Sequence, residues 1–194
     1  MKKNNEPKFY ILIAKPILYI FVKFFIRPKI IGLDKIPKKG RIVLAGNHTN
    51  NLDSVMLVGI IPRVIHFMAK DSLYKGIKKI LFSNMGIIPV NRKIHDKNSL
   101  YKAIELLNED KVIGIFPEGT INRTNNIILP FKIGAVKMAH DTNSQIIPFT
   151  IKGKYFSSNL KIEFLDPIKI KDENDLTQEN KRLENIIINN LGGE

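Results

Sequence analysis

The sequence predicts a single α/β domain with a mixed, largely parallel central sheet flanked by helices. Short apolar runs alternate with amphipathic stretches along the chain, as expected of strands that helices connect. With 194 residues, 44% of them hydrophobic, the chain is long enough for one full core and too short for two ordinary domains. A basic and strongly apolar segment comes first, so we divide the chain into an N-terminal segment (1–30) and an α/β domain (31–194).

The net charge of +13 lies entirely in the first half of the chain. Residues 1–100 hold 19 Lys and Arg against 5 Asp and Glu, whereas residues 101–194 hold 12 against 13. Such an uneven distribution indicates that one side of the fold meets an anionic surface, and both membranes and nucleic acids qualify. Because there is no cysteine, disulfides, thiolate metal sites and cysteine nucleophiles are excluded, and a reducing compartment is expected.

The N-terminal segment contains an apolar stretch, residues 9–26, that only Lys15, Pro16 and Lys23 interrupt. It is slightly short for a membrane span, which needs about 20 apolar residues. On a helical wheel the lysines share one side and apolar residues cover the others, a pattern typical of a helix in a membrane interface. Pro16 is expected to bend the helix or divide it into a pair. A core helix and a transmembrane span are the alternatives.

Six short apolar runs predict the strands of the sheet. In chain order they are residues 41–45, 64–69, 86–92, 112–116, 145–151 and 160–164. Pro148 lies inside the fifth run, where it cannot donate a ladder hydrogen bond, so it predicts an edge strand or a bulge. The Pro-, Gly- and Lys-rich residues 27–40 are interpreted as a connector.

Five further stretches predict helices, at residues 53–60, 71–84, 96–108, 131–140 and 175–191. The first ends at Gly59 and Pro62, and the last ends at Gly192. Asp71 or Ser72 can cap the second. This second helix mixes lysines with apolar residues, so it is either another membrane contact or an ordinary solvated face.

His48 and Asp53 lie in the polar stretch between the first predicted strand and the first predicted helix. A regular helix would separate the two side chains by about 140°, and a regular strand would place them on opposite faces. They can act together only if the chain turns sharply at this junction, and the Asn and Thr residues between them favour a turn. A carboxylate that orients a histidine makes a general base near neutral pH. The alternative is an ordinary helix start capped by Asn51.

Further polar residues follow two other predicted strands. Arg92 ends the third strand, and Glu118, Gly119 and Thr120 follow the fourth. These groups can converge with the His–Asp pair, because sites of α/β sheets gather at the carboxyl ends of strands. An arginine can grip a phosphate with two hydrogen bonds, and a Gly-Thr pair can offer N–H groups and a hydroxyl. Lys132, at the start of a helix, adds positive charge. Alternatively, Arg92 forms a surface ion pair and Glu118 is an ordinary turn residue.

Four sequence blocks resemble the glycerolipid acyltransferases and, more closely, the bacterial 1-acylglycerol-3-phosphate acyltransferases. In chain order the blocks are Asn47 with His48-x4-Asp53, Gly86 through Pro89 to Arg92, Phe116-Pro117-Glu118-Gly119-Thr120, and Ile147-Pro148. They occur in the order found in the family and extend over residues 41–150. As a set they are highly specific, whereas the His-x4-Asp spacing alone would be weak.

The resemblance implies a glycerol-3-phosphate acyltransferase-like fold, in which residues 31–194 form the acyltransferase domain. It also implies transfer of a fatty acyl group from acyl-CoA or acyl carrier protein to the sn-2 hydroxyl of lysophosphatidic acid, giving phosphatidic acid in phospholipid biosynthesis. His48 would be the general base, oriented by Asp53, and Arg92 with the loop 118–120 would hold the phosphate. The N-terminal segment would hold the protein, as a monotopic or peripheral protein, on the phospholipid surface at the cytoplasmic face of the cell membrane.

The chemistry is consistent with this resemblance. Acyl transfer from a thioester to a hydroxyl needs a base, and no metal or cofactor besides the acyl donor is expected. Since the chain has neither a cysteine nor a Gly-x-Ser-x-Gly elbow, we expect direct transfer rather than an acyl-enzyme.

The chain departs from the family pattern after the third block. Members usually continue Gly-Thr-Arg-Ser, but here Ile121 and Asn122 follow Thr120, and the next arginine is Arg123. Either Arg123 takes the role of the usual arginine of this block, or phosphate binding relies more on Arg92 and Lys132. The identity of the acyl acceptor is therefore left open. Besides lysophosphatidic acid, the alternatives are glycerol 3-phosphate, another lysolipid and an acylated amino acid.

Two non-enzymatic functions are also alternatives. A basic protein that binds a membrane or a nucleic acid would fit the net charge. However, the basic residues coincide with apolar runs and no nucleic-acid-binding motif occurs, so we expect no nucleic-acid partner. A membrane-anchored scaffold with a relic site is the other alternative, and the intact His48 and Asp53 argue against it.

Overall fold

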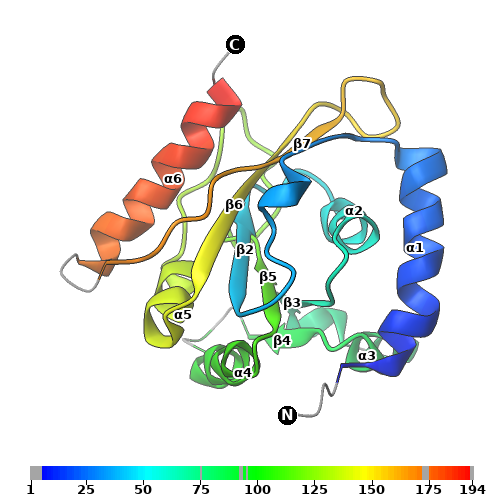
Figure 1. Cartoon of the computed structure of the whole chain (residues 1–194), viewed down its shortest axis with the longest axis horizontal. Coiled ribbons are helices and arrows are strands. Elements are labelled where there is room, and N and C mark those ends of the chain that lie inside the picture. The colour runs from blue at the N-terminus through cyan, green and yellow to red at the C-terminus, as the bar shows by residue number, and fades with distance from the viewer. Residues whose placement is uncertain (1–5, 75, 92–93, 95, 172–174, 193–194) are drawn as a thin grey trace.

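Seven strands form one sheet at the centre of the protein, within the residues that the structure describes (6–74, 76–91, 94, 96–171 and 175–192). In this computed structural model (Figure 1) they lie in the order β1 (Lys29–Ile31), β7 (Lys161–Phe164), β6 (Gln145–Lys152), β2 (Ile42–Gly46), β5 (Val112–Ile115), β3 (Ile65–Lys70) and β4 (Ile88–Val90). Neighbouring strands run parallel, except that β6 and β7 are antiparallel. The predicted α/β class with a mixed, largely parallel sheet is therefore confirmed.

Helices cover both faces of the sheet. They are α1 (Lys15–Phe21), α2 (Asp53–Ile60), α3 (Ile77–Asn84), α4 (Lys97–Asn108), α5 (Gly134–Thr142) and α6 (Leu176–Gly192), with short 3-10 helices η3 (Leu33–Lys35) and η4 (Asp71–Leu73). Figure 1 shows α1 and α2 on one face and α4, α5 and α6 on the other. Along β2, Ile42 and Leu44 join the core on the first face, and Val43 and Ala45 join the core on the second. Burial on both faces explains why this run is apolar throughout.

Two expectations about strands were wrong. Residues 29–31, inside the predicted connector, form β1, because pairing with β7 stabilises a run that is too short to recognise from its sequence. β6 is an interior strand, since β2 and β7 flank it, although Pro148 had suggested an edge. The β6–β7 ladder stops at the pair Phe149–Phe164, and the Pro148 carbonyl next to it accepts a hydrogen bond from the N–H of Leu165 (2.8 Å). The missing N–H of proline therefore breaks no ladder bond.

The helix expected over residues 71–84 is split in two. Asp71–Leu73 form only η4, and α3 begins at Ile77. The cause is Gly76, whose φ of 53° and ψ of −140° lie far from helical values. Gly76, rather than Asp71 or Ser72, therefore sets the beginning of the helix.

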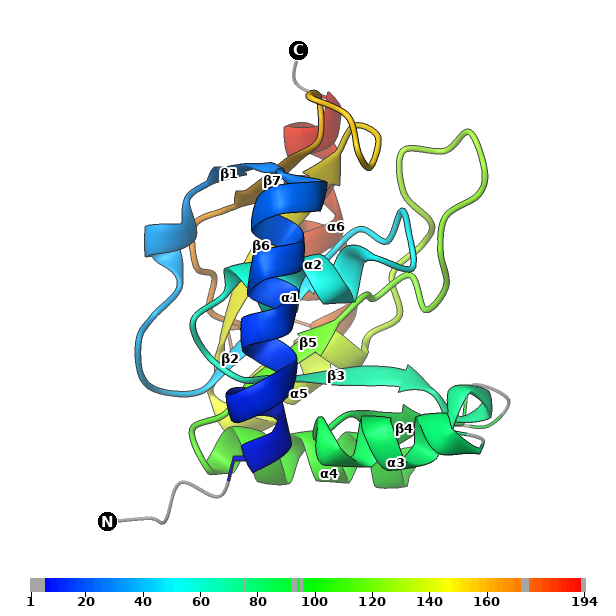
Figure 2. The same cartoon turned by 90° about the vertical axis from the view of Figure 1, so that its right-hand side faces the viewer.

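Residues 10–26 form one continuous helix, in which two π-helical turns, η1 (Tyr10–Ala14) and η2 (Val22–Ile26), flank α1 (Figure 2). Pro16 lies in the first turn of α1 and does not divide the helix into a pair. The preceding turn is π-helical, with the N–H of Lys15 bonded to the carbonyl of Tyr10, so the chain is already widened where proline would otherwise clash. The following β1 spans the predicted boundary at residue 30.

The side of this helix that faces the domain follows a repeat of four residues. Its members are Tyr10, Ala14, Leu18, Val22 and Ile26, all buried or half-buried. On an ideal α-helix such a repeat would drift by about 40° at each step, because each residue turns the chain by about 100°. The wider π-helical turns underwind the helix at both ends. The repeat therefore remains a stripe along one side of the helix. Its part in α1 and η2 packs against α2, and the Tyr10 hydroxyl accepts a hydrogen bond from the N–H of Ile65 in β3 (3.2 Å).

The other side of the helix exposes large apolar side chains. Leu12 is 71% exposed, Phe24 62% and Ile20 53%. Lys15 and Lys23, two repeats apart, lie on the same flank: the Lys15 ammonium donates to the carbonyl of Pro62, and Lys23 is exposed. Among the described residues, no helix combines the length and the apolar character that a membrane crossing requires.

We expect the close packing of this helix on α2 to tolerate no side chain at Gly59. A Cβ there would lie 2.6 Å from Cγ2 of Val22 and 2.8 Å from the carbonyl oxygen of Leu18. Gly59→Ala should therefore destabilise the protein by about 1–3 kcal/mol in urea unfolding, although alanine is the better helix former.

Gly134→Ala is the matched control, because the added Cβ at the start of α5 would be 3.8 Å from the nearest atom described for it, Cδ1 of Ile115. It should be neutral or stabilising by up to about 1 kcal/mol. A Gly59→Ala protein as stable as Gly134→Ala would contradict the proposed packing.

Candidate active site

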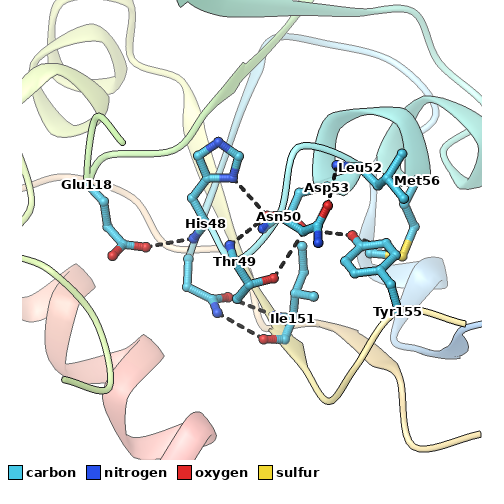
Figure 3. Close-up of polar contacts among 10 residues, drawn as sticks. His48, Thr49, Asn50, Leu52, Asp53, Met56, Glu118, Ile151 and Tyr155 are labelled. Carbon is cyan, nitrogen blue, oxygen red and sulfur yellow. Dashed lines mark hydrogen bonds and ion pairs between the residues drawn. The ribbon is translucent and has the colours of Figure 1, made fainter. Parts of the chain in front are cut away.

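Three loops meet where β2, β5 and β6 end. They are residues 47–52, 116–133 and 153–160, and each follows the carboxyl end of its strand. Because the three strands are parallel neighbours, their loops lie on the same edge of the sheet. Figure 3 shows the side chains of His48, Asp53, Glu118 and Tyr155 gathered there.

Asp53 is the first residue of α2, and its side chain is fully buried. The chain turns back on itself before the helix, so that Oδ2 accepts hydrogen bonds from His48 Nδ1 (2.8 Å) and from the backbone N–H groups of Thr49 (2.7 Å) and Asn50 (2.8 Å). Oδ1 accepts from the hydroxyls of Thr49 (3.2 Å) and Tyr155 (2.6 Å). The predicted strand-to-helix turn thus brings His48 and Asp53 into direct contact.

The His48 ring is held on two sides. Phe116 stacks on its face, with ring centroids 4.0 Å apart and planes 10° apart, while Asp53 binds its Nδ1. Since an ionised carboxylate can only accept, Nδ1 carries a proton and the neutral ring has its lone pair on Nε2. None of the hydrogen bonds described for His48 uses Nε2, and Figure 3 shows that this edge of the ring points away from Asp53. In this arrangement Nε2 is the ring nitrogen that can accept a proton.

Asn47 continues the pairing of β2 with β6 beyond the end of β2. Its side-chain amide donates to the carbonyl of Ile151 (2.9 Å) and accepts from the N–H of Ile151 (2.8 Å), and the residue is 3% exposed. The side chain thereby replaces a backbone partner. The Asn47 backbone can then leave the sheet and enter the His48 turn while β6 stays alongside.

Glu118 holds the His48 turn rather than facing solvent. Its Oε1 accepts from the backbone N–H of His48 (2.6 Å) and its Oε2 accepts from that of Leu129 (2.7 Å). The His48 carbonyl accepts in turn from the N–H of Asn122 (2.8 Å). Burial raises the pKa of Glu118, against the effect of these two N–H donors. The loop after β5 is thus bonded to both backbone groups of His48.

Gly119 and Lys132 lie against each other in this loop. Gly119 has a φ of 73°, and a Cβ at this position would be 3.0 Å from Nζ of Lys132. The Lys132 N–H donates to the carbonyl of the buried Pro117 (2.9 Å). Next to Lys132, α6 holds Phe131, whose N–H donates to Glu184 (2.6 Å) and whose carbonyl accepts from Asn180 (2.9 Å). The backbone at Lys132 is therefore fixed by its own bond to Pro117 and by the bonds of the preceding Phe131 to α6.

The other predicted phosphate ligands are less closely placed. Thr120 and Arg123 are exposed members of the same loop. Arg92 lies outside the described residues. Gly86, with a φ of 66°, and the exposed Pro89 lie at β4, the edge strand on the far side of β5 and β3 from β2. The predicted residues therefore form one described group around His48 and a second, more distant group at β4.

Two residues of the site could not be assigned from sequence. Phe116, the stacking partner of His48, belongs to the third sequence block, but nothing in its spacing indicates a ring contact. Tyr155 lies 102 positions from Asp53 in a polar loop, and no motif contains it. Pro148, in the fourth block, pairs with Ala45 in the β2–β6 ladder, so it lies beside the strand that leads to His48.

The α/β fold has a His–Asp pair at the carboxyl edge of its sheet, and the comparison with known proteins identifies the family. The chain belongs to the acyltransferase family, because the family model described as Acyltransferase matches residues 27–152. The family resemblance predicted from the four sequence blocks is thereby confirmed.

Two bacterial relatives have the same name, 1-acyl-sn-glycerol-3-phosphate acyltransferase. The protein from Borreliella burgdorferi is 34% identical over 142 residues, which are 68% of this chain and 56% of that protein. The protein from Bacillus subtilis is 34% identical over 128 residues, 64% of this chain and 62% of that protein. This chain thus spans somewhat more than half the length of these relatives.

A solved structure shares the fold. The crystal structure of the 1-acyl-sn-glycerophosphate (LPA) acyltransferase PlsC from Thermotoga maritima matches with a TM-score of 0.73 at 21% identity. The match covers 92% of this chain and 80% of that chain.

We expect Asn47→Asp to make stability strongly pH-dependent. The ionised Asp would set a carboxylate oxygen against the Ile151 carbonyl, whereas the protonated Asp can still donate to it. Burial should raise the pKa of this carboxyl in the folded state above its unfolded value of about 3.9. The variant should therefore match the wild type below about pH 4 and lose about 2–4 kcal/mol as the pH rises through the folded value.

Urea unfolding of both proteins between pH 4 and pH 8 measures this difference, and the wild type at each pH corrects for other titrating groups. Equal stabilities at pH 8 would show that the Asn47–Ile151 pairing does not hold the loop.

Proposed function

We propose that the protein is a 1-acyl-sn-glycerol-3-phosphate acyltransferase that makes phosphatidic acid in phospholipid biosynthesis. The observation that carries this proposal is the His48–Asp53 pair, in which Nδ1 is bound at 2.8 Å and Nε2 points outward. Membership of the acyltransferase family supports the reaction type, and the names of the two bacterial relatives support the acceptor.

In the proposed reaction, His48 Nε2 takes the proton of the acceptor's sn-2 hydroxyl while the hydroxyl oxygen attacks the thioester carbonyl. The tetrahedral intermediate collapses by breaking the carbon–sulfur bond, and the departing thiolate receives the proton from His48. Asp53 stabilises the imidazolium that forms between these two steps. The acyl donor, acyl-CoA or acyl carrier protein, is the only co-substrate, and no cofactor takes part.

The acceptor's phosphate would bind beside His48 at the loop that follows β5. The exposed Lys132 ammonium lies over Gly119, and Thr120 and Arg123 are exposed in the same loop. These groups supply positive charge and hydrogen-bond donors, as a phosphate requires. Arg92 is proposed as a further ligand from its sequence block. Glu118, whose two oxygens bind backbone N–H groups, would act by fixing the loop rather than by touching the anion.

The exposed side of the N-terminal helix would lie in the membrane interface. Leu12, Ile20 and Phe24 would enter the lipid, and Lys23 on the flank would reach the headgroups. At the end of this helix where the chain begins (Figures 1 and 2), α3 adds the exposed Ile80 (65%) and Leu81 (42%). The basic excess would favour the anionic cytoplasmic leaflet, where the protein would be monotopic or peripheral.

We expect His48→Ala to lower the turnover number by about a thousandfold or more, because in the proposed reaction His48 takes the proton of the hydroxyl. Purified protein would be assayed for phosphatidic acid with lysophosphatidic acid as the acceptor and with each thioester donor. Glycerol 3-phosphate would be offered in parallel as a competing acceptor.

His140→Ala is the matched control, because His140 also contacts an aspartate, Asp141 (3.3 Å), but lies on α5. It should leave the turnover unchanged. Turnover close to that of the wild type in His48→Ala would refute the mechanism, and preference for glycerol 3-phosphate would refute the acceptor.

We expect a triple variant, Leu12→Glu, Ile20→Glu and Phe24→Glu, to lose binding to vesicles that contain anionic lipid. The three side chains are exposed, so their replacement should change the free energy of unfolding by less than about 1 kcal/mol. Sedimentation with vesicles measures binding. Deleting residues 1–26 would be a less specific test, since it would also remove Tyr10, Val22 and Ile26 from the core.

Tyr101→Glu is the control, because Tyr101 is 61% exposed on α4, on the opposite face of the sheet. It should still sediment with vesicles. Vesicle binding by a folded triple variant would place the membrane contact elsewhere.

A further inference from the structure

The Asp53 carboxylate accepts five hydrogen bonds from the described residues, and four of these come from the turn itself. The four donors are the His48 ring, two backbone N–H groups and the Thr49 hydroxyl. The fifth is the hydroxyl of Tyr155, which comes from the loop after β6 and makes the shortest of the five bonds (2.6 Å).

The five bonds are unevenly divided between the two carboxylate oxygens. Oδ2, which faces His48, has three donors at 2.7–2.8 Å. Among the described residues, the donors to Oδ1 are Tyr155 and the more distant Thr49 hydroxyl at 3.2 Å. Tyr155 is therefore the main group that satisfies Oδ1, and it opposes any rotation of the carboxylate that would move Oδ2 away from His48.

The loop that carries Tyr155 is closed by hydrogen bonds among its own residues. The Asn159 side chain accepts from the Lys154 N–H (3.0 Å) and from the Ser157 hydroxyl (2.9 Å). Gly153, with a φ of 94°, begins the loop two residues after Ile151, which Asn47 binds. The phenol ring is half-buried, and its oxygen also lies 3.9 Å from Sδ of Met56 on α2.

We infer that Tyr155 is a positioning residue of the active site, which acts on His48 through Asp53. The inference rests on the proposed function, since it assumes that His48 is the base. The hydroxyl would have two effects: it fixes the orientation of the carboxylate, and it draws part of the negative charge toward Oδ1. Both effects depend on the hydroxyl and not on the ring.

Tyr155 remains a hydrogen-bond donor over the whole working pH range. Burial raises the pKa of its phenol, and the negative charge of Asp53 raises it further. The phenol therefore keeps its proton at every pH at which the His48–Asp53 pair would act. It serves as a constant donor, and it neither supplies nor removes the proton of the reaction.

Removing the hydroxyl should leave less of the His48 ring in the neutral form that can accept a proton. Without this donor, the Asp53 carboxylate directs more negative charge at His48 and holds the imidazolium form more strongly. The neutral ring, which alone can accept the proton of the acceptor, then forms only at higher pH. The carboxylate also gains freedom to rotate, which lowers the rate at every pH.

Tyr155→Phe tests this inference, because it keeps the ring and removes only the hydroxyl. We expect the turnover number to fall about 10- to 100-fold, as for the loss of a hydrogen bond to a charged group, with the KM of both substrates nearly unchanged. The acid limb of the pH–rate profile should move to higher pH. Tyr101→Phe, the same change at an exposed site on α4, should alter neither quantity.

A purely structural role predicts a different result. In that case the yield and the thermal stability of Tyr155→Phe would fall, but the folded protein would keep the wild-type turnover and acid limb, and the inference would be wrong. If Tyr155→Phe does not fold, a ring-fluorinated tyrosine at position 155 keeps the hydroxyl and makes it a stronger donor. The acid limb should then move to lower pH, and an unchanged limb would refute the inference.

The companion variant His48→Ala separates this inference from the proposed function. If His48→Ala is inactive and Tyr155→Phe behaves as the wild type, only the role of Tyr155 is refuted. If His48→Ala is active, the proposed mechanism itself fails.

Discussion

The buried carboxylate of Asp53 is the group on which the rest of the site depends. A charge that is fully removed from water is tolerated only if hydrogen bonds compensate it, and Asp53 accepts five from the described residues. Its place at the first position of α2 adds the favourable field of the helix N-terminus. Because the same bonds that stabilise the charge also close the turn, the conformation of residues 48–53 and the orientation of the His48 ring are specified together.

The remaining contacts connect this turn to the rest of the sheet edge. Asn47 binds the end of β6 through Ile151, and Glu118 and Asn122 bind the two backbone groups of His48. The loop after β5 is held in turn by α6, through Phe131. The three loops therefore form one bonded unit, and contacts within the chain hold the histidine in place.

The sequence was informative wherever the signal is local. Alternating apolar and amphipathic runs predicted most of the elements, since burial on both faces of a parallel sheet produces such runs. The spacing of His48 and Asp53 predicted a sharp turn, because no regular structure joins them. Contacts between distant segments leave no such signal, and this is why β1, the stacking of Phe116 and the bond from Tyr155 could not be predicted. Pro148 was misleading for the same reason: its tolerance depends on where the neighbouring strand stops.

The four-residue repeat of the N-terminal helix limits how this part of the chain can vary in length. The buried stripe at residues 10, 14, 18, 22 and 26 leaves three other stripes, one of which contains Lys15 and Lys23. Inserting one residue would rotate the part of the helix before the insertion by about a quarter of a turn relative to α2. Polar or oversized side chains would then occupy the buried positions of the stripe. Inserting four residues would restore it. The helix can therefore gain or lose length only in whole repeats, whatever the composition of its exposed side.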